Sequence, residues 1–159
     1  MNGTRNSPVV STGKAPSSHA SEYRPRVLVV DDESVIADTV AKVLSVSGYA
    51  AIAAYDADGA LETALLSPPE LLLTDVVLPG MNGIDLAITI KRIYPECKIM
   101  LFSGQASTVD LLAAADRKGH RFTLLNKPVP PKDLVAMVAE HLNTNSMKTN
   151  GAARAIAVA

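Results

Sequence analysis

The feature of this sequence that most restricts its fold is a repeated alternation of short apolar runs with longer segments of helical periodicity. The apolar runs are VLVV (27–30), YAAIAAY (49–55), LLLTD (71–75), KIMLFS (98–103) and RFTLLN (121–126). A run such as VLVV, which has no polar alternation, is typical of a strand buried on both faces. Five successive strand–helix units predict an α/β fold. We expect a five-stranded parallel sheet, doubly wound, with right-handed crossovers and helices on both faces as a three-layer sandwich.

The segments between these runs carry the signals of five helices. After the first run, apolar residues recur at helical spacing at Val35, Ile36, Val40, Val43 and Leu44, and Gly48 follows as a C-terminal glycine. The other helices are expected at about 57–66, 84–93, 106–118 and 131–142. Asp56 or Asp58 is expected to cap the helix at 57–66, and Pro131 to open the last helix. Pro95 and Gly119 are expected to end the helices at 84–93 and 106–118.

Composition supports one globular domain between two polar arms. Hydrophobic residues make up 48% of the 159 residues and aromatic residues only 4%, so the core is expected to be aliphatic. Residues 1–24 are rich in Ser, Thr, Asn, Gly and Pro and predict a disordered N-terminal arm. Residues 144–159 predict a flexible C-terminal tail, in which AARAIAVA is too short for a stable isolated helix. The domain itself is expected to span residues 25–143.

Charge and hydropathy exclude several classes of function. The net charge is −1, but residues 27–142 carry −6, whereas residues 1–26 carry +3 and residues 143–159 carry +2. The arms have too few clustered Lys and Arg side chains to predict direct nucleic-acid binding. No apolar run approaches the roughly 20 residues of a membrane span, and the N-terminus lacks the apolar region of a signal peptide. Because the single cysteine, Cys97, also cannot form an internal disulfide, a cytoplasmic location without membrane contact is expected.

Polar side chains follow the predicted strands at the points where those strands end. They are Asp31 and Asp32 after the first strand, Asp75 after the third, Ser103 after the fourth and Lys127 after the fifth. Each has an ordinary explanation on its own, such as a helix cap for the two adjacent acids. In a parallel sheet, however, the carboxyl ends of the strands meet at the edge where ligands bind. The five residues are therefore expected to form one site.

The chemistry of this set points to phosphoryl transfer. Three neighbouring carboxylates repel one another and need a cation, and their oxygens suit Mg²⁺, which also bridges to phosphate oxygens. A lysine ammonium and a serine hydroxyl can contact phosphoryl oxygens. Aspartate is a known covalent nucleophile for phosphoryl groups. Asp75, on the central part of the sheet, is the candidate acceptor.

Taken in order, the segments VLVVDD, LLLTDVVLPGMNGIDL, IMLFSG and LLNKP resemble the receiver domain of two-component response regulators, the CheY-like family. The resemblance covers about residues 25–143 and is most specific in the pattern D-x-x-L-P-G-M-x-G. It implies a flavodoxin-like fold and a phosphoacceptor signalling domain rather than an enzyme. The phosphoryl group would come from a histidine kinase or a histidine phosphotransfer protein.

The resemblance also assigns roles around the acceptor. Asp75 would be the phosphoacceptor. Asp32 would bind Mg²⁺ directly and Asp31 would bind it through water. The backbone carbonyl of Val77 would complete the protein ligands of the metal.

Further roles fall on the later part of the chain. Ser103 would be the switch hydroxyl that moves toward the phosphoryl oxygens, and Lys127 would pair with the phosphoryl group. The peptide bond before Pro128 is expected to be cis. Pro79 and Gly83 would shape the loop after the acceptor.

The sequence departs from the family pattern at three positions. The position three before Lys127 usually carries Tyr or Phe, but here it is Leu124, with Phe122 two residues earlier. Val77 and Gln105 occupy positions that influence how readily water reaches the phosphoryl group. Because Val77 cannot orient a water molecule, a comparatively long-lived phosphoaspartate is expected.

The output of the protein is expected to be a docking event. Only 17 residues follow the last expected helix, too few for an output domain, so a single-domain response regulator is expected. The segment TVDLLAAADRKG could present small apolar residues to a partner after a phosphorylation-driven shift between two states. Leu111 and Leu112 in this segment could equally belong to the core.

Two alternatives stay open. The first is a receiver-like domain that binds partners without phosphorylation, which Leu124 favours. The second is an aspartate-nucleophile phosphatase of the haloacid-dehalogenase type. That chemistry needs an acid two residues after the nucleophile, where this chain has Val77, and the sequence also lacks a glycine-rich phosphate loop.

Overall fold

The five strands form a single parallel sheet. The computed structural model describes residues 22–104 and 108–156, with side chains described as far as residue 143. The strands are β1 (Arg26–Val30), β2 (Ala50–Ala54), β3 (Leu71–Asp75), β4 (Lys98–Ser103) and β5 (Thr123–Asn126). Their order is β2-β1-β3-β4-β5, and every neighbouring pair is parallel. The predicted fold is confirmed, although β5 begins two residues later than the apolar run beginning at Arg121.

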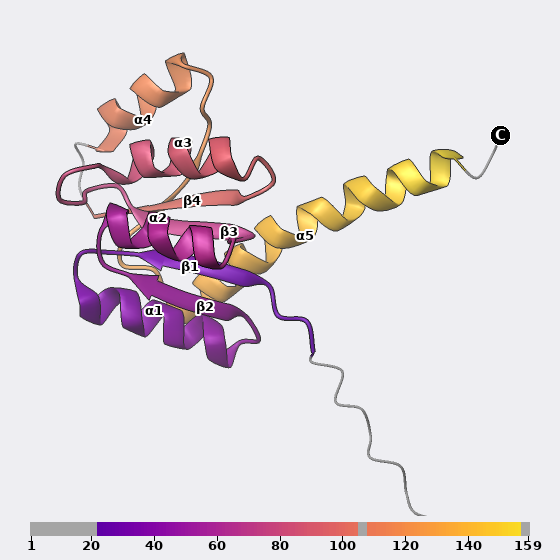
Figure 1. Cartoon of the computed structure of the whole chain (residues 1–159), viewed down its shortest axis with the longest axis horizontal. Helices are drawn as coiled ribbons and strands as arrows, with labels where there is room; N and C mark the ends of the chain where they lie inside the picture. The colour runs from indigo at the N-terminus through magenta and orange to yellow at the C-terminus, as the bar shows by residue number, and fades with distance from the viewer. Residues whose placement is uncertain (1–21, 105–107, 157–159) are drawn as a thin grey trace, which may run out of the picture.

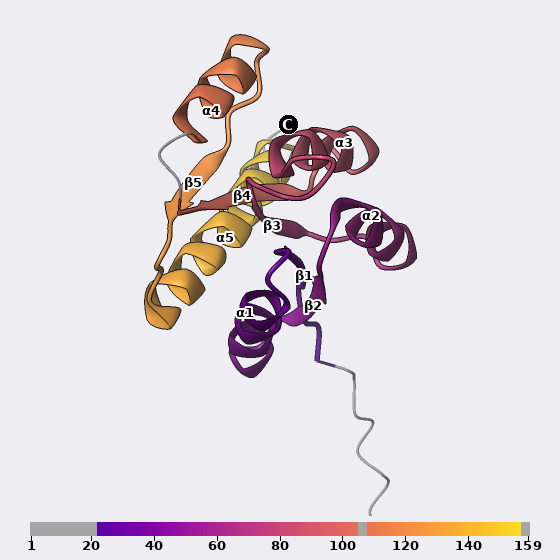
Figure 2. The same cartoon turned by 90° about the vertical axis from the view of Figure 1, so that its left-hand side faces the viewer.

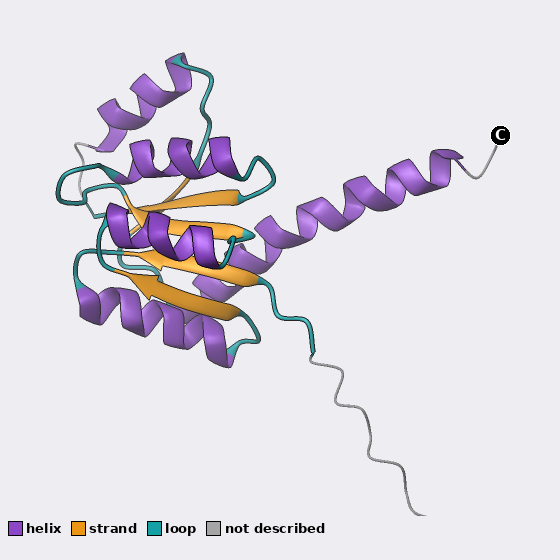
Figure 3. Ribbon diagram, viewed as in Figure 1, coloured by secondary structure: helices purple, strands orange, loops and turns teal. Residues whose placement is uncertain are grey.

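Helices cover both faces of this sheet (Figures 1 and 3). They are α1 (Ser34–Val46), α2 (Ala57–Leu66), α3 (Gly83–Ile93), α4 (Thr108–Arg117) and α5 (Pro131–Ile156). Figure 2 shows α1 and α5 on one face and α2 and α3 on the other. Asp56 caps α2 by accepting a hydrogen bond from the backbone N–H of Gly59, and the residues of positive φ, Gly48 and Gly119, follow α1 and α4 as predicted.

Alternation along the strands divides the core between the two faces. Leu28, Val30 and Leu72 pack toward α2 and α3, whereas Val27, Val29 and Leu73 pack toward α1 and α5. Side chains of the central strands β1 and β3 are therefore buried on both faces, as their unbroken apolar runs predict. Burying each leucine contributes roughly 1.5–3 kcal/mol, so the sheet is a rigid base for the residues at its edge.

The buried face of α1 differs from the expected one. Val35 is 76% exposed, whereas the buried positions of this helix are Ala37, Ala41 and Leu44. The alanines lie on the face turned to the sheet, where a small side chain lets the helix backbone come close. Val35 therefore fits the helical spacing that predicted this helix, but its side chain faces solvent.

The last helix is longer than expected. The sequence predicts an end at residue 142 and a flexible tail over residues 144–159, but α5 continues to Ile156 and extends away from the sheet in Figure 1. Residues 143–156 contain no proline, the strongest helix breaker, so the polar residues after Leu142 and Gly151 lower the helix propensity without stopping the helix. The expected N-terminal arm, at residues 1–24, lies almost entirely outside the described residues.

Candidate functional site

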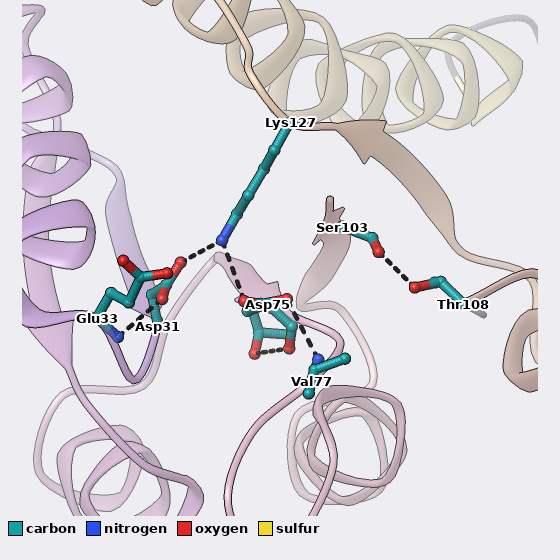
Figure 4. Close-up of polar contacts among 8 residues, drawn as sticks. Asp31, Glu33, Asp75, Val77, Ser103, Thr108 and Lys127 are labelled. Atoms are coloured by element: carbon teal, nitrogen blue, oxygen red, sulfur yellow. Dashed lines mark hydrogen bonds and ion pairs between the residues drawn. The ribbon is translucent and has the colours of Figure 1, made fainter. Parts of the chain in front are cut away.

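Four of the predicted site residues meet at the carboxyl edge of the sheet. Asp31 and Asp32 directly follow β1, Asp75 ends β3, and Lys127 directly follows β5. Carboxylate oxygens of the three aspartates lie within 4.8 Å of one another. Figure 4 shows the Lys127 side chain reaching across the edge to Asp31 and Asp75. Parallel pairing of β1, β3, β4 and β5 brings together residues that are up to 96 positions apart.

Lys127 joins two of the carboxylates. Its Nζ donates to Asp31 Oδ2 at 2.6 Å and to Asp75 Oδ2 at 3.0 Å. Burial lowers the pKa of the Lys127 ammonium, but hydrogen bonds and charges from Asp31 and Asp75 outweigh burial and raise this pKa above its usual value. The Nζ also lies 5.8 Å from the centre of the Phe102 ring, a cation–π distance. The lysine is therefore charged and held in place.

The acidic cluster has the donor set of a hard divalent cation. The carboxylates of Asp31, Asp32 and Asp75 supply three negative charges and the Lys127 ammonium supplies one positive charge, leaving a formal charge of −2. Asp31 is buried, Asp75 is partly buried and Asp32 is exposed, so the cluster opens to solvent on one side. Carboxylate oxygens with space for water are what Mg²⁺ prefers. The residues present fit this metal.

The acids do not cap α1 in the way considered from the sequence. The N-cap residue of α1 is Glu33, which makes no side-chain capping hydrogen bond. Asp31 Oδ1 instead accepts a hydrogen bond from the backbone N–H of Glu33 at 3.0 Å, one residue ahead of the helix. This bond orients the Asp31 carboxylate, whose second oxygen is held by Lys127.

Both carboxylate oxygens of Asp75 have partners. Lys127 binds Oδ2, and the backbone N–H of Val77 donates to Oδ1 at 3.2 Å. Asp75 is the last residue of β3, which lies in the middle of the sheet between β1 and β4. Its main chain is therefore fixed by the sheet while its side chain faces the site.

The loop after Asp75 returns very close to it. Gly80 has a φ of +75°, and Asn82 caps α3 by accepting a hydrogen bond from the backbone N–H of Asp85. The backbone N–H of Gly83 donates to the Val76 carbonyl at 2.9 Å. A β-carbon at Gly83 would lie 1.8 Å from the backbone oxygen of Asp75, so only glycine fits there.

Ser103 lies at the same edge, but its hydroxyl is engaged elsewhere. It is buried at the end of β4, and its Oγ shares a hydrogen bond with the Oγ1 of Thr108, the first residue of α4. Thr108 was not among the site residues predicted from the sequence. A threonine at the start of a predicted helix, five residues after a site hydroxyl, is the signal that could have found it.

The remaining predicted features fall on β5 and the α4 region. The Lys127–Pro128 peptide bond is cis, as expected. Leu124 and Phe122 are partly buried against the core, and Phe122 stacks on His120 with the ring centres 6.2 Å apart. Leu112 packs on the core, whereas Leu111 is 40% exposed, so the α4 segment contributes to both core and surface. Gln105 lies outside the described residues.

Known proteins with similar sequences and folds identify the family of this chain. The sequence profile of the response regulator receiver domain matches residues 27–139. The chain belongs to the response regulator receiver domain family. Receiver domains are the phosphoacceptor modules of two-component signal transduction, in which histidine kinases supply the phosphoryl group.

Curated relatives are larger than this chain. The nitrogen assimilation regulatory protein NtrX of Azorhizobium caulinodans is 36% identical over 120 residues, which is 74% of this chain and 26% of that protein. The DNA-binding response regulator MtrA of Mycobacterium tuberculosis is 34% identical over 122 residues, which is 77% of this chain and 52% of that protein. The chain thus spans about a quarter to a half of the length of these relatives.

A solved receiver domain matches nearly end to end. The CheY-like response regulator receiver domain protein of Methanospirillum hungatei has 27% sequence identity and a TM-score of 0.72, with 79% of this chain and 99% of that chain covered.

Within the described part of this receiver chain, no helix is both long and apolar enough to cross a bilayer.

Cys97 lies at the opposite, amino edge of the receiver sheet and gives a prediction for thiol chemistry. Burial raises its pKa from 9.0 to about 11. Between these values the unfolded chain ionises this thiol and the folded chain does not, so its contribution to stability is complete below about pH 9 and falls as pH rises toward 11.

At pH 9 we expect iodoacetamide to alkylate the native thiol at least about 50-fold more slowly than the unfolded thiol, because only the thiolate reacts. Intact mass against time, with and without urea, measures both rates. Equal rates would contradict the buried position of Cys97.

Proposed function

We propose that this protein is a response regulator whose Asp75 accepts a phosphoryl group with the help of Mg²⁺. The observation that carries the proposal is the contact of Lys127 with Asp31 and Asp75 inside a cluster of three carboxylates. The receiver unit would span residues 25–143, and the donor would be a histidine kinase or a histidine phosphotransfer protein. Phosphorylation would shift the domain to a state that docks a protein partner.

The residues take the following parts in transfer. One carboxylate oxygen of Asp75 attacks the phosphorus, the phosphorus–nitrogen bond of phosphohistidine breaks, and its electron pair leaves with the imidazole. The Lys127 ammonium, 3.0 Å from Asp75 Oδ2, would bind an equatorial phosphoryl oxygen, and the Ser103 hydroxyl would donate to another. Mg²⁺ bound there would offset the negative charge of the phosphoryl oxygens. Asp31, Asp32, Asp75 and the backbone carbonyl of Val77 would hold it.

The test is phosphorylation of the full chain by acetyl phosphate, in which a phosphorus–oxygen bond breaks and acetate leaves. Intact mass is read for the wild type and for Asp75→Asn, each with Mg²⁺ and with a chelator. We expect a gain of one phosphoryl group only in the wild type with Mg²⁺. Glu33→Gln is the matched control, since Glu33 is an exposed acid beside the cluster whose side chain has no assigned role.

Two results would overturn the proposal. One is an equal mass gain in Asp75→Asn, which would place the acceptor elsewhere. The other is no gain in the wild type, which would favour partner binding without phosphorylation, the alternative that Leu124 supports. The decay of the product at neutral pH tests a further point. Val77 offers no group to orient water, so the phosphoaspartate is expected to outlast seconds.

A further inference from the structure

Two buried hydroxyl groups meet at the junction of β4 and α4. Ser103 is 3% exposed at the end of β4, and Thr108 is 1% exposed at the start of α4. Their side-chain oxygens share a hydrogen bond, and either oxygen can be the donor. Because both groups are shielded from water, this bond is costly to break without a replacement partner.

The Ser103 side chain points along this bond. In Figure 4 the Ser103 hydroxyl points to Thr108, on the side away from the carboxylate of Asp75 and the ammonium of Lys127. A Ser103 side chain turned this way points its oxygen away from a phosphoryl group on Asp75, whichever of the two oxygens donates in the bond. The Ser103 side chain must therefore leave Thr108 before it can serve that group.

We propose that Thr108 is a positioning residue, which holds the Ser103 hydroxyl away from Asp75 until a phosphoryl group competes for it. The proposal rests on the function proposed above for Asp75 and adds a residue to which that function assigned no part. Release of Ser103 also removes a bond between β4 and the first turn of α4. The state of Asp75 is thereby coupled to α4 through two hydroxyls, in a chain that has Leu124 where relatives of this family usually have an aromatic residue.

Thr108→Val tests this directly, because valine keeps the shape of threonine and lacks the hydroxyl. The probe is beryllofluoride, a mimic of the phosphoryl group, titrated with Mg²⁺ into the full chain and followed by amide NMR shifts. Loss of one net hydrogen bond, about 1 kcal/mol, predicts that Thr108→Val binds beryllofluoride about fivefold more tightly than the wild type. Thr108→Ser, which restores the hydroxyl, should bind as the wild type does.

A double-mutant cycle with Ser103→Ala separates positioning from a general change in packing. In the Ser103→Ala background, Thr108→Val should leave the affinity unchanged, since no hydroxyl remains to be held. Unchanged affinity in Thr108→Val alone, or a gain that persists in the Ser103→Ala background, would overturn the proposal. If the wild type neither binds beryllofluoride nor takes a phosphoryl group, the proposed function fails and this inference with it. If the wild type does both, the mutant affinities test the positioning role of Thr108 separately from the proposed function.

Discussion

Replacing Lys127 with methionine is expected to slow phosphoryl transfer from acetyl phosphate to Asp75 by at least about a hundredfold. The ammonium lies 3.0 Å from Asp75 Oδ2, where charge must be compensated as the phosphoryl group arrives. Methionine keeps most of the length and apolar surface of the side chain but cannot donate a hydrogen bond. The initial rate of mass gain at saturating Mg²⁺ measures the effect.

The same substitution is expected to destabilise the fold. It leaves the carboxylates of Asp31 and Asp75 without their cation, and removing one partner of a buried ion pair costs about 3 kcal/mol. In urea unfolding, the loss should be largest with a chelator present and smaller with Mg²⁺, because a divalent cation offsets the same charges. Mg²⁺ should therefore stabilise the Lys127→Met variant more than it stabilises the wild type.

Lys132→Met is the matched control for both measurements. Lys132 is an exposed residue in the first turn of α5, and its removal changes the net charge by the same amount. We expect its rate and stability to match the wild type. A rate for Lys127→Met within about tenfold of the wild type would argue against a role of this lysine in transfer.

Gly83→Ala is expected to destabilise the protein by at least about 4 kcal/mol or to prevent folding. The added β-carbon would lie 1.8 Å from the backbone oxygen of Asp75 and 2.8 Å from its carbonyl carbon. These are main-chain atoms at the end of a central strand, which cannot rotate away as a flexible side chain could. Relief would have to come from moving α3 or the end of β3, and with it the acceptor.

Alanine substitutions at two other glycines serve as controls for general effects of replacing glycine. A β-carbon at Gly104 would lie 3.7 Å from the Lys127 β-carbon, an ordinary contact, so Gly104→Ala should be near neutral. Gly80 has open space but a φ of +75°, so Gly80→Ala should cost only about 1–2 kcal/mol of conformational strain. Urea midpoints of the three variants give the order. A Gly83→Ala variant as stable as Gly80→Ala would contradict the close approach.

Much of the fold could be predicted because its signals are local. The unbroken apolar runs of β1 and β3, the cap of α2 at Asp56 and the stop of α3 before Pro95 each depend on a few neighbouring residues. Prediction failed where a local signal pointed the wrong way. The polar residues after Leu142 and Gly151 indicated an end to the last helix, but α5 continues to Ile156, and Val35 fitted the periodicity of α1 although it faces solvent.

The sequence by itself determined the parallel α/β architecture and the identity of the residues at its carboxyl edge, because strand ends are set by local patterns and parallel strands end on the same side. Only the tertiary structure decided how those residues pair. The two bonds of Lys127, the separation of Gly83 from Asp75 and the contact of Ser103 with Thr108 depend on the packing of segments and on side-chain direction. In a buried site, several donors and acceptors compete for the same partners, and this competition selects the direction of each side chain. The order of residues along the chain does not specify which of these hydrogen bonds is made.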